Sequence, residues 1–259
     1  MSPSKGDYLK FRLLTYMKST FTTQALVLNR KEFGENDLKV DVLTRDRGRF
    51  SLVARGAKKM NSKLAAHVEP FTLSDIMVVK GRQMDYIGSA VGRESFLEIK
   101  NDLVRVYYAG KTARFILRYI KEEEEIEAEE YFHLVRTFWE LLDKEKEVAE
   151  EKGELWYIFF VLHFLHIYGL SPQVQGCVRC GVGIRSGNNA FHIKEGGIIC
   201  PSCYQGGEEH LLTISDECIK ILKLVSAYNL EQNRKININS ELLSEFRDIV
   251  YQFFLYNNT

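Results

Sequence analysis

The chain has 259 residues and a formal net charge of zero at pH 7, and 45% of its residues are hydrophobic, 12% aromatic and 27% charged. These fractions are ordinary for folded globular proteins and exclude a disordered or fibrous chain. The length suits one large domain or two smaller ones, and we expect two.

The zero net charge conceals an uneven distribution of charge along the chain. Residues 1–119 contain 22 Lys and Arg against 12 Asp and Glu, whereas residues 120–259 contain 13 against 23. A basic module can hold a polyanion whatever the charge of the whole chain. We therefore expect an acidic partner to bind the first half.

The first 20 residues are predicted to be an extension ahead of the first strand. They contain scattered basic residues but neither the apolar segment nor the small-residue cleavage site of a secretory signal. We therefore expect a cytoplasmic protein without a membrane partner.

Residues 21–95 show the pattern of a small β-barrel. Five short runs rich in β-forming residues are separated by turn residues: TTQALVLN, DLKVDVLT, RFSLVARG, FTLSDIMVVKG and MDYIGSAVG. In the second run Leu38, Val40 and Val42 alternate with polar residues, and the third run repeats this alternation. Closure removes exposed strand edges, so these runs predict a five-stranded barrel of the OB type.

A cluster of cations lies in and after the turn between the second and third runs. Asp46 is the single acid among them. Since phosphates receive most contacts in protein–DNA interfaces, we predict a DNA-binding surface formed by Arg45, Arg47, Arg49, Arg55, Lys58, Lys59 and Lys63. The alternative is an ordinary solvated surface. Phe33 and Tyr86 are available for base stacking, but Phe50 alternates with core positions, so contact with phosphates is better supported than stacking.

Residues 96–259 are predicted to form a mainly α-helical domain. Apolar residues recur there at steps of three and four, including helices at 154–169, 215–230 and 240–256. The apolar run 155–170 is short for a membrane span and predicts a buried helix, in which His163 and His166 are core histidines rather than metal ligands. The acidic run at 122–130 predicts a solvated loop or helix start rather than a cation site.

Four cysteines predict a metal site within the helical domain. Cys177, Cys180, Cys200 and Cys203 follow the pattern C-x2-C-x19-C-x2-C, which is typical of zinc ribbons. We predict a zinc-ribbon module at residues 174–206 with one structural Zn²⁺ per chain. A fifth cysteine, Cys218, is predicted to be a buried thiol. A thioredoxin-like site would need a βαβ context, and four thiolate ligands leave no open position for catalysis.

Three segments resemble the bacterial recombination-mediator family RecO. They are TTQALVLNRKEFGENDLKVDVLTRDRGRFSLVARGAKK, EPFTLSDIMVVKGRQMDYIGSA and CVRC…CPSC, in this order, and the resemblance spans roughly residues 22–230. Its most specific part contains GE-x-D, T-R-x-x-G and A-R-G-A-(R/K)-K. Arg45, Arg49, Arg55, Lys58 and Lys59 fall in these basic motifs, and the four cysteines match the family's zinc ligands.

The resemblance implies an α+β protein with an OB barrel, a helical domain and a zinc module, and no enzymatic activity. It implies binding of single- and double-stranded DNA, annealing of complementary strands, and a location at the nucleoid. It also implies partnership with RecR and single-strand-binding protein in loading RecA.

Two alternatives use other parts of the chain. In the first, the cysteine module touches the partner, as in a protein-interaction or transcription-associated adaptor; its few cations, Arg179, Arg185 and Lys194, make a DNA groove contact poorly supported. In the second, the acidic run serves a metal-dependent nuclease. No phosphate-binding loop, dinucleotide motif, metalloprotease helix or nucleophile elbow is found in the sequence, so we expect no enzyme.

Overall fold

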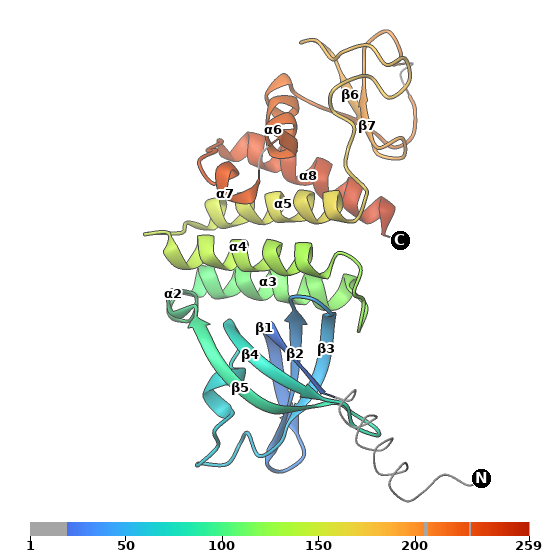
Figure 1. Ribbon diagram of the computed structural model, residues 1–259. Helices are drawn as coiled ribbons and strands as arrows, with labels where there is room; N and C mark the ends of the chain where they lie inside the picture. The colour runs from blue at the N-terminus through green and yellow to red at the C-terminus, as the bar shows by residue number, and fades with distance from the viewer. Residues whose placement is uncertain (1–19, 205–206, 228, 259) are drawn as a thin grey trace, which may run out of the picture. The chain divides into compact units, whose positions relative to one another are not determined.

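The computed structural model describes residues 20–204, 207–227 and 229–258 (Figure 1). Our predicted N-terminal extension, residues 1–20, lies outside the described residues except for Thr20. The chain divides into two compact units, of which the first ends at Trp139 and the second begins at Glu140.

The first unit contains a closed five-stranded barrel in the order β1-β2-β3-β5-β4. Its strands are β1 (Thr20–Phe33), β2 (Asp37–Thr44), β3 (Gly48–Ala54), β4 (Thr72–Val79) and β5 (Tyr86–Ser95). Neighbouring strands are antiparallel, except that β3 meets β5 in a parallel pairing of Val53 with Tyr86. All five strands predicted from the sequence are confirmed.

Alternating side chains of the strands fill the barrel. Leu38, Val40 and Val42 of β2 lie in the same buried cluster as Phe50 and Leu52 of β3, as their alternation predicts. Burying each such side chain stabilises the fold by about 1.5–3 kcal/mol. The opposite faces of these strands carry polar side chains such as Lys39 and Ser51, together with the buried Leu43 and Val53.

The helices of the first unit pack against the barrel. They are α2 (Leu97–Asn101), α3 (Leu103–Tyr119) and the start of α4 (Ala128–Lys144), with a short 3-10 helix, η1 (Ala65–Val68), between β3 and β4. Figure 1 shows α3 running across one end of the barrel. The fully buried Trp139 ring contacts Phe71 and Phe96 at centroid distances of 5.3 and 5.7 Å, and its indole N–H donates to Thr112 Oγ1 at 3.0 Å.

This aromatic cluster explains where the first unit ends. The predicted boundary at residue 96 coincides with the end of β5 at Ser95, whereas the compact unit continues to Trp139. Edge-to-face aromatic pairs contribute about 0.5–1.5 kcal/mol beyond the area they bury. The helical segment up to Trp139 is thereby fixed to the barrel.

The second unit is built around α5 (Glu150–Ile167). Its other elements are β6 (Ala190–His192), β7 (Gly197–Ile199), β8 (Leu211–Thr213), α6 (Asp216–Ala227), α7 (Leu230–Asn233) and α8 (Ser240–Asn257). Phe159 of α5 packs on Phe246 of α8, with ring centroids 6.0 Å apart. The three short strands form a sheet in the order β7-β6-β8, and Phe191 of β6 lies edge-on to Phe253 of α8 at 5.7 Å.

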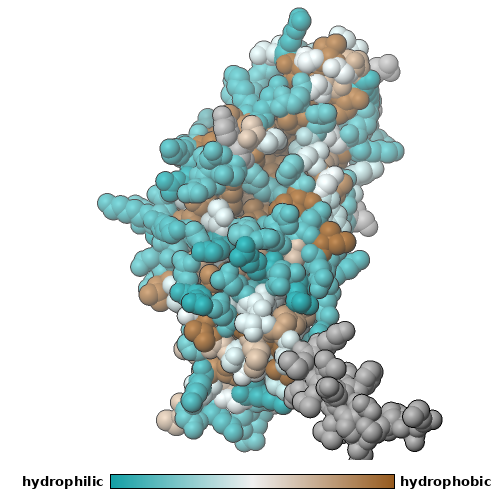
Figure 2. Space-filling view, viewed as in Figure 1, coloured by the Kyte–Doolittle hydropathy of each residue, from teal (hydrophilic) through white to brown (hydrophobic). Residues whose placement is uncertain are grey.

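The most apolar segment of the chain is confirmed as a buried helix. Eleven residues of α5 are buried, among them Trp156 and Phe160. Over the described part of the chain, no helix has the length and apolar character needed to cross a membrane. On the face shown in Figure 2, hydrophilic residues predominate and hydrophobic ones are scattered among them.

Candidate nucleic-acid interface and cysteine site

The conformation of the turn between β2 and β3 is fixed by side-chain hydrogen bonds. Thr44 Oγ1 donates to the Gly48 carbonyl at 2.7 Å and accepts from the Arg47 N–H at 3.2 Å. Gly48 has φ +72°, a conformation that glycine adopts without steric cost. Thr23 Oγ1 also donates to the carboxylate of Asp46. The turn predicted at residues 46–48 is confirmed, with Thr44 opposite Gly48.

A segment far along the chain lies against this turn. We call residues 122–129 the acidic strap. The Glu123 N–H donates to the Arg49 carbonyl at 2.9 Å, and Arg49 Nε donates to the Ile120 carbonyl at 2.8 Å. A Cβ added at Gly48 would collide with the Glu124 carbonyl, so glycine is needed there for the close approach as well as for its φ. The strap is therefore held by its backbone as well as by its charges.

The strap's carboxylates pair with the cations of the turn. Glu129 Oε1 lies 2.6 Å from Arg45 Nη2, and Glu122 Oε1 lies 3.2 Å from Arg49 Nη1. Hydrogen bonding and the positive charge of Arg45 lower the pKa of the Glu129 carboxyl. Both side chains of the Arg45–Glu129 pair are exposed, so water and salt screen the attraction between them.

Two further cations meet the strap. Glu125 lies 3.6 Å from Arg47, whose guanidinium also stacks 4.4 Å above the Phe21 ring. Glu123 lies 2.8 Å from Lys80 Nζ, and although partial burial lowers the Lys80 pKa, hydrogen bonds with Glu123 and Asp85 raise it overall. The strap thus counters the first three cations of the predicted DNA-binding surface.

The expectation that the acidic run is merely solvated is therefore only partly right. α4 begins at Ala128, so the run does lead into a helix, but the residues before it contact the β2–β3 turn. Among the described residues, the groups of side chains able to hold a metal include none of the strap's carboxylates. The residues in contact are 71 to 84 positions apart in the sequence, so local charge patterning could not predict that they meet.

The remaining predicted cations lie on the loop after β3. The Lys58 N–H donates to the Asn36 carbonyl at 3.0 Å, and the Gly56 N–H donates to Asp37 Oδ1 at 2.7 Å, so the loop is anchored to the β1–β2 turn. Lys58 pairs with Glu32 at 3.2 Å. Lys59 and Lys63 are exposed and form no ion pair with any described residue.

The structure therefore splits the seven predicted residues into two groups. Arg45, Arg47 and Arg49 face the acidic strap, whereas the others surround the opposite, loop-bearing part of β3. We call this second group the loop cations: Arg55, Lys58, Lys59 and Lys63. Arg82, on the loop between β4 and β5, lines the same groove as Arg55 and was missed from the sequence. The sequence feature that could have pointed to Arg82 is the pair of cations in the segment KGR at residues 80–82.

The four predicted cysteines converge in the second unit. The Sγ atoms of Cys177, Cys180, Cys200 and Cys203 all lie within 4.8 Å of one another, close enough to hold a metal ion. All four are free thiols. Two hairpin turns, each with a C-x-x-C pair, bring them together: the Gly181 N–H donates to the Cys177 carbonyl and the Cys203 N–H donates to the Cys200 carbonyl, both at 2.9 Å.

The chemistry of this donor set fits a thiophilic metal. Burial acts to raise the Cys177 pKa, but backbone N–H donors from Cys200, Cys180 and Arg179 outweigh it and lower the pKa to about 6. Neighbouring thiols raise the pKa of Cys203 to about 12. Four sulfurs with one readily formed thiolate match the preference of Zn²⁺ for tetrahedral sulfur coordination, and four ligands close the site.

Arg179, between the first two cysteines, joins both halves of the module. Its guanidinium pairs with Glu208 and, at 2.7 Å, with Glu195, and it donates to the Cys203 carbonyl at 3.0 Å. His192 lies 3.5 Å from Glu195 in the same group. Although these carboxylates and His192 are near enough to share a cation, Arg179 already supplies the positive charge. Arg179 is thus engaged within the module.

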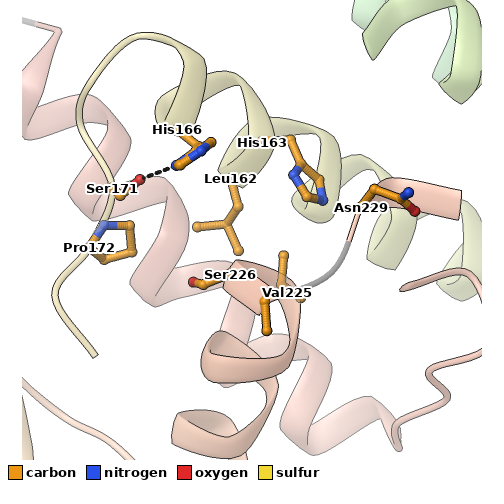
Figure 3. Close-up of a pocket in the computed structure, with 9 residues that line it drawn as sticks. Leu162, His163, His166, Ser171, Pro172, Val225, Ser226 and Asn229 are labelled. Atoms are coloured by element: carbon orange, nitrogen blue, oxygen red, sulfur yellow. Dashed lines mark hydrogen bonds between the residues drawn. The ribbon is translucent and has the colours of Figure 1, made fainter. Parts of the chain in front are cut away.

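The prediction that His163 and His166 are core histidines is wrong for His166, which is exposed and bonded to Ser171 (Figure 3). His163 is partly buried, its Nε2 lies 3.2 Å from the Asn233 amide nitrogen, and desolvation followed by the nearby His166 lowers its pKa to about 4. His166 Nδ1 lies 2.8 Å from Ser171 Oγ. Both line a cavity of about 260 Å³ with Leu162 and Val225. Cys218 is buried as predicted, and burial raises its pKa.

Comparison with known proteins finds matches over both units. The family model described as "Recombination protein O N terminal" matches residues 17–96, and "Recombination protein O C terminal" matches residues 100–257. A protein named DNA repair protein RecO from Alkaliphilus metalliredigens is 28% identical over 235 residues, which are 90% of this chain and 92% of the relative. A protein of the same name from Roseiflexus sp. is 29% identical over 89% of this chain and 78% of its own length. Another from Bacillus pumilus is 25% identical over 90% of this chain and 87% of its own length.

Proposed function

Because this chain belongs to the RecO family of DNA repair proteins, we propose that it is a non-catalytic DNA-binding recombination mediator. It binds single- and double-stranded DNA and promotes annealing. With RecR it loads RecA onto strands covered by single-strand-binding protein, at the nucleoid. Family membership supports the pathway and its partners; the chemistry of the barrel supports the DNA contact.

One observation carries the DNA-binding proposal. The loop cations lie on an anchored loop of the barrel, and among described residues only Lys58 of the four forms an ion pair. The strand order β1-β2-β3-β5-β4 with closure onto β1 supports an OB-type barrel, a fold that binds oligonucleotides near its β1–β2 and β4–β5 loops. The loop cations and Arg82 lie beside these two loops.

The mechanism follows from charge neutralisation. Lys and Arg that contact phosphates release condensed counterions, which gives affinity that is strong at low salt and largely independent of sequence. A protein that neutralises two strands also lowers their mutual repulsion, so annealing needs neither base-specific contacts nor nucleotide hydrolysis. At the other end of β3, a strand must displace the acidic strap before it reaches Arg45 or Arg47.

The cysteine site has a structural role in this proposal. Cys177, Cys180, Cys200 and Cys203 hold one Zn²⁺ in a zinc-ribbon module. The metal would cross-link the two cysteine turns, around which only a small apolar cluster is packed. Four protein ligands leave no open coordination position, so the metal has no catalytic role. With Arg179 occupied inside the module, Arg185 and Lys194 remain as its exposed cations, fewer than the four loop cations of the barrel.

The experiment is a binding titration of the full chain with a labelled single-stranded oligonucleotide at low salt. Replacing Arg55, Lys59 and Lys63 with Gln weakens binding about tenfold or more, because three phosphate contacts are lost. The matched control replaces three exposed lysines of the second unit, Lys194, Lys220 and Lys235, with Gln. Equal affinities for the first variant and the wild type would refute the proposal.

A further inference from the structure

We propose that a groove on the barrel, between the β1–β2 turn and the β4–β5 loop, holds an unpaired base of single-stranded DNA. The groove has a volume of about 600 Å³, within the range of about 300–1,000 Å³ that small-molecule sites occupy. Its aromatic, apolar and cationic lining includes Phe33, Val53, Arg55, Arg82, Met84 and Tyr86. The inference rests on the DNA-binding function proposed above and assigns one subsite to it.

The aromatic surface of the groove is rigid. Tyr86 is the residue through which β5 meets β3, opposite Val53, and the Val53 N–H donates to the Asp85 carbonyl at 2.9 Å. The Arg55 guanidinium lies 4.0 Å above the centre of the Tyr86 ring. A base that packs on this pair meets planar surfaces already in position, so little ordering cost is added on binding.

Phe33 supplies the second aromatic surface. It is the last residue of β1, and 40% of its surface is exposed although it is a large apolar side chain. Phe50, by contrast, is buried in the barrel core. The two aromatics that the sequence leaves free for stacking are thus brought to a single groove. From the sequence, contact with phosphates is better supported than stacking; this convergence adds support for stacking beside it.

The charge of the groove fits a nucleotide. Neither Arg55 nor Arg82 forms an ion pair within the described part of the chain, and the one lining acid, Asp37, accepts the Gly56 N–H. A neighbouring cavity of about 380 Å³ is lined by Asp85, Glu122 and Glu123 against Lys39 and Lys80, so its lining carries more acids than cations. The groove therefore suits an anionic strand better than the cavity beside it does.

The occupant is a single strand because only there is the face of a base accessible. In a duplex each base is stacked between its neighbours, and a protein meets base edges and phosphates instead. Stacking is tolerant of sequence because every base has a π-face. Arg55 stands three positions before Lys58, so one strand can place a base in the groove and its phosphates along the loop cations.

The test compares an oligothymidine of about 12 nucleotides with an abasic strand of the same length, bound to the full chain. Tyr86→Leu and Phe33→Ala each weaken binding of the oligothymidine by about fivefold or more, since stacking is worth about 5- to 150-fold per base. Binding of the abasic strand stays within about twofold of the wild type. Phe33→Ala alters an exposed side chain, so it keeps the test valid if Tyr86→Leu fails to fold.

Two controls define the outcome. Tyr86→Phe retains the ring and the affinity, and Tyr168→Leu, an exposed aromatic of the second unit, leaves both strands unaffected. Equal losses on the abasic strand and the oligothymidine would overturn the stacking subsite while leaving the DNA-binding function intact. Failure of the wild type to bind either strand would overturn the proposed function, and the subsite with it.

Discussion

Removing the negative charge of the acidic strap is expected to strengthen DNA binding. In Glu125→Gln/Glu129→Gln the carboxylates facing Arg47 and Arg45 are neutralised. Exposed ion pairs are weak and are screened by salt, so releasing Arg45 and Arg47 is expected to raise the affinity by about 2- to 30-fold. Arg49 is left out because its side chain is only 16% exposed and donates to the Ile120 carbonyl.

Fluorescence anisotropy with a labelled single strand measures this gain across a range of salt concentrations. Each phosphate contact on a single strand contributes about 0.7 to the slope of log K against log salt. If both freed arginines reach phosphates, this slope becomes steeper by about 1.4. Glu147→Gln/Glu151→Gln makes the same change of net charge at exposed positions of the second unit. An equal gain in this control, or no gain in the strap variant, would refute local competition between strap and DNA.

Three further predictions concern the fold. Cys177→Ser is expected to abolish zinc retention and to lower the yield of folded protein, as measured by metal content after dialysis and by circular dichroism; full zinc occupancy in the variant would contradict the four-thiolate site. In urea unfolding, Gly48→Ala is expected to lower the free energy of unfolding by clearly more than Gly34→Ala, because both glycines have positive φ but only Gly48 also faces the strap's backbone. Equal losses of unfolding free energy in the two variants would count against that contact. The pKa of His163 is lower in the folded than in the unfolded chain, so its contribution to stability is complete above pH 6.5 and is lost as the pH falls toward 4. Between pH 7 and 4.5 the wild type should lose about 2 kcal/mol more stability than His163→Gln, and parallel losses would be inconsistent with a partly buried imidazole that is neutral in the folded chain.

The strands and the cysteine site could be predicted because their signals are local. Alternation at Leu38, Val40 and Val42 marks a strand with one buried face, and a turn at Gly48 joins it to the next. The C-x-x-C pairs fix the ligands through two short turns. Each strand and each C-x-x-C turn is determined by residues a few positions apart, and the pairing of the two cysteine turns follows from the zinc-ribbon spacing of 19 residues between them.

The two features that shape the proposed DNA-binding surface depend on contacts between distant residues. Arg45 and Glu129 are 84 positions apart, and their pairing follows from the way α3 and α4 return the chain to the barrel. Phe33 and Tyr86 come together only because closure places β5 next to β3. Periodicity and composition report which residues are buried or charged, but not which charged residues meet.

The salt dependence of single-strand binding tests the central claim most directly. If the loop cations hold the phosphate backbone, the slope of log K against log salt is shallower in Arg55→Gln/Lys59→Gln/Lys63→Gln than in the wild type by about 2, at about 0.7 per lost contact. The control Lys194→Gln/Lys220→Gln/Lys235→Gln keeps the wild-type slope. Identical slopes for all three proteins would contradict the assignment of the DNA-binding surface to the barrel.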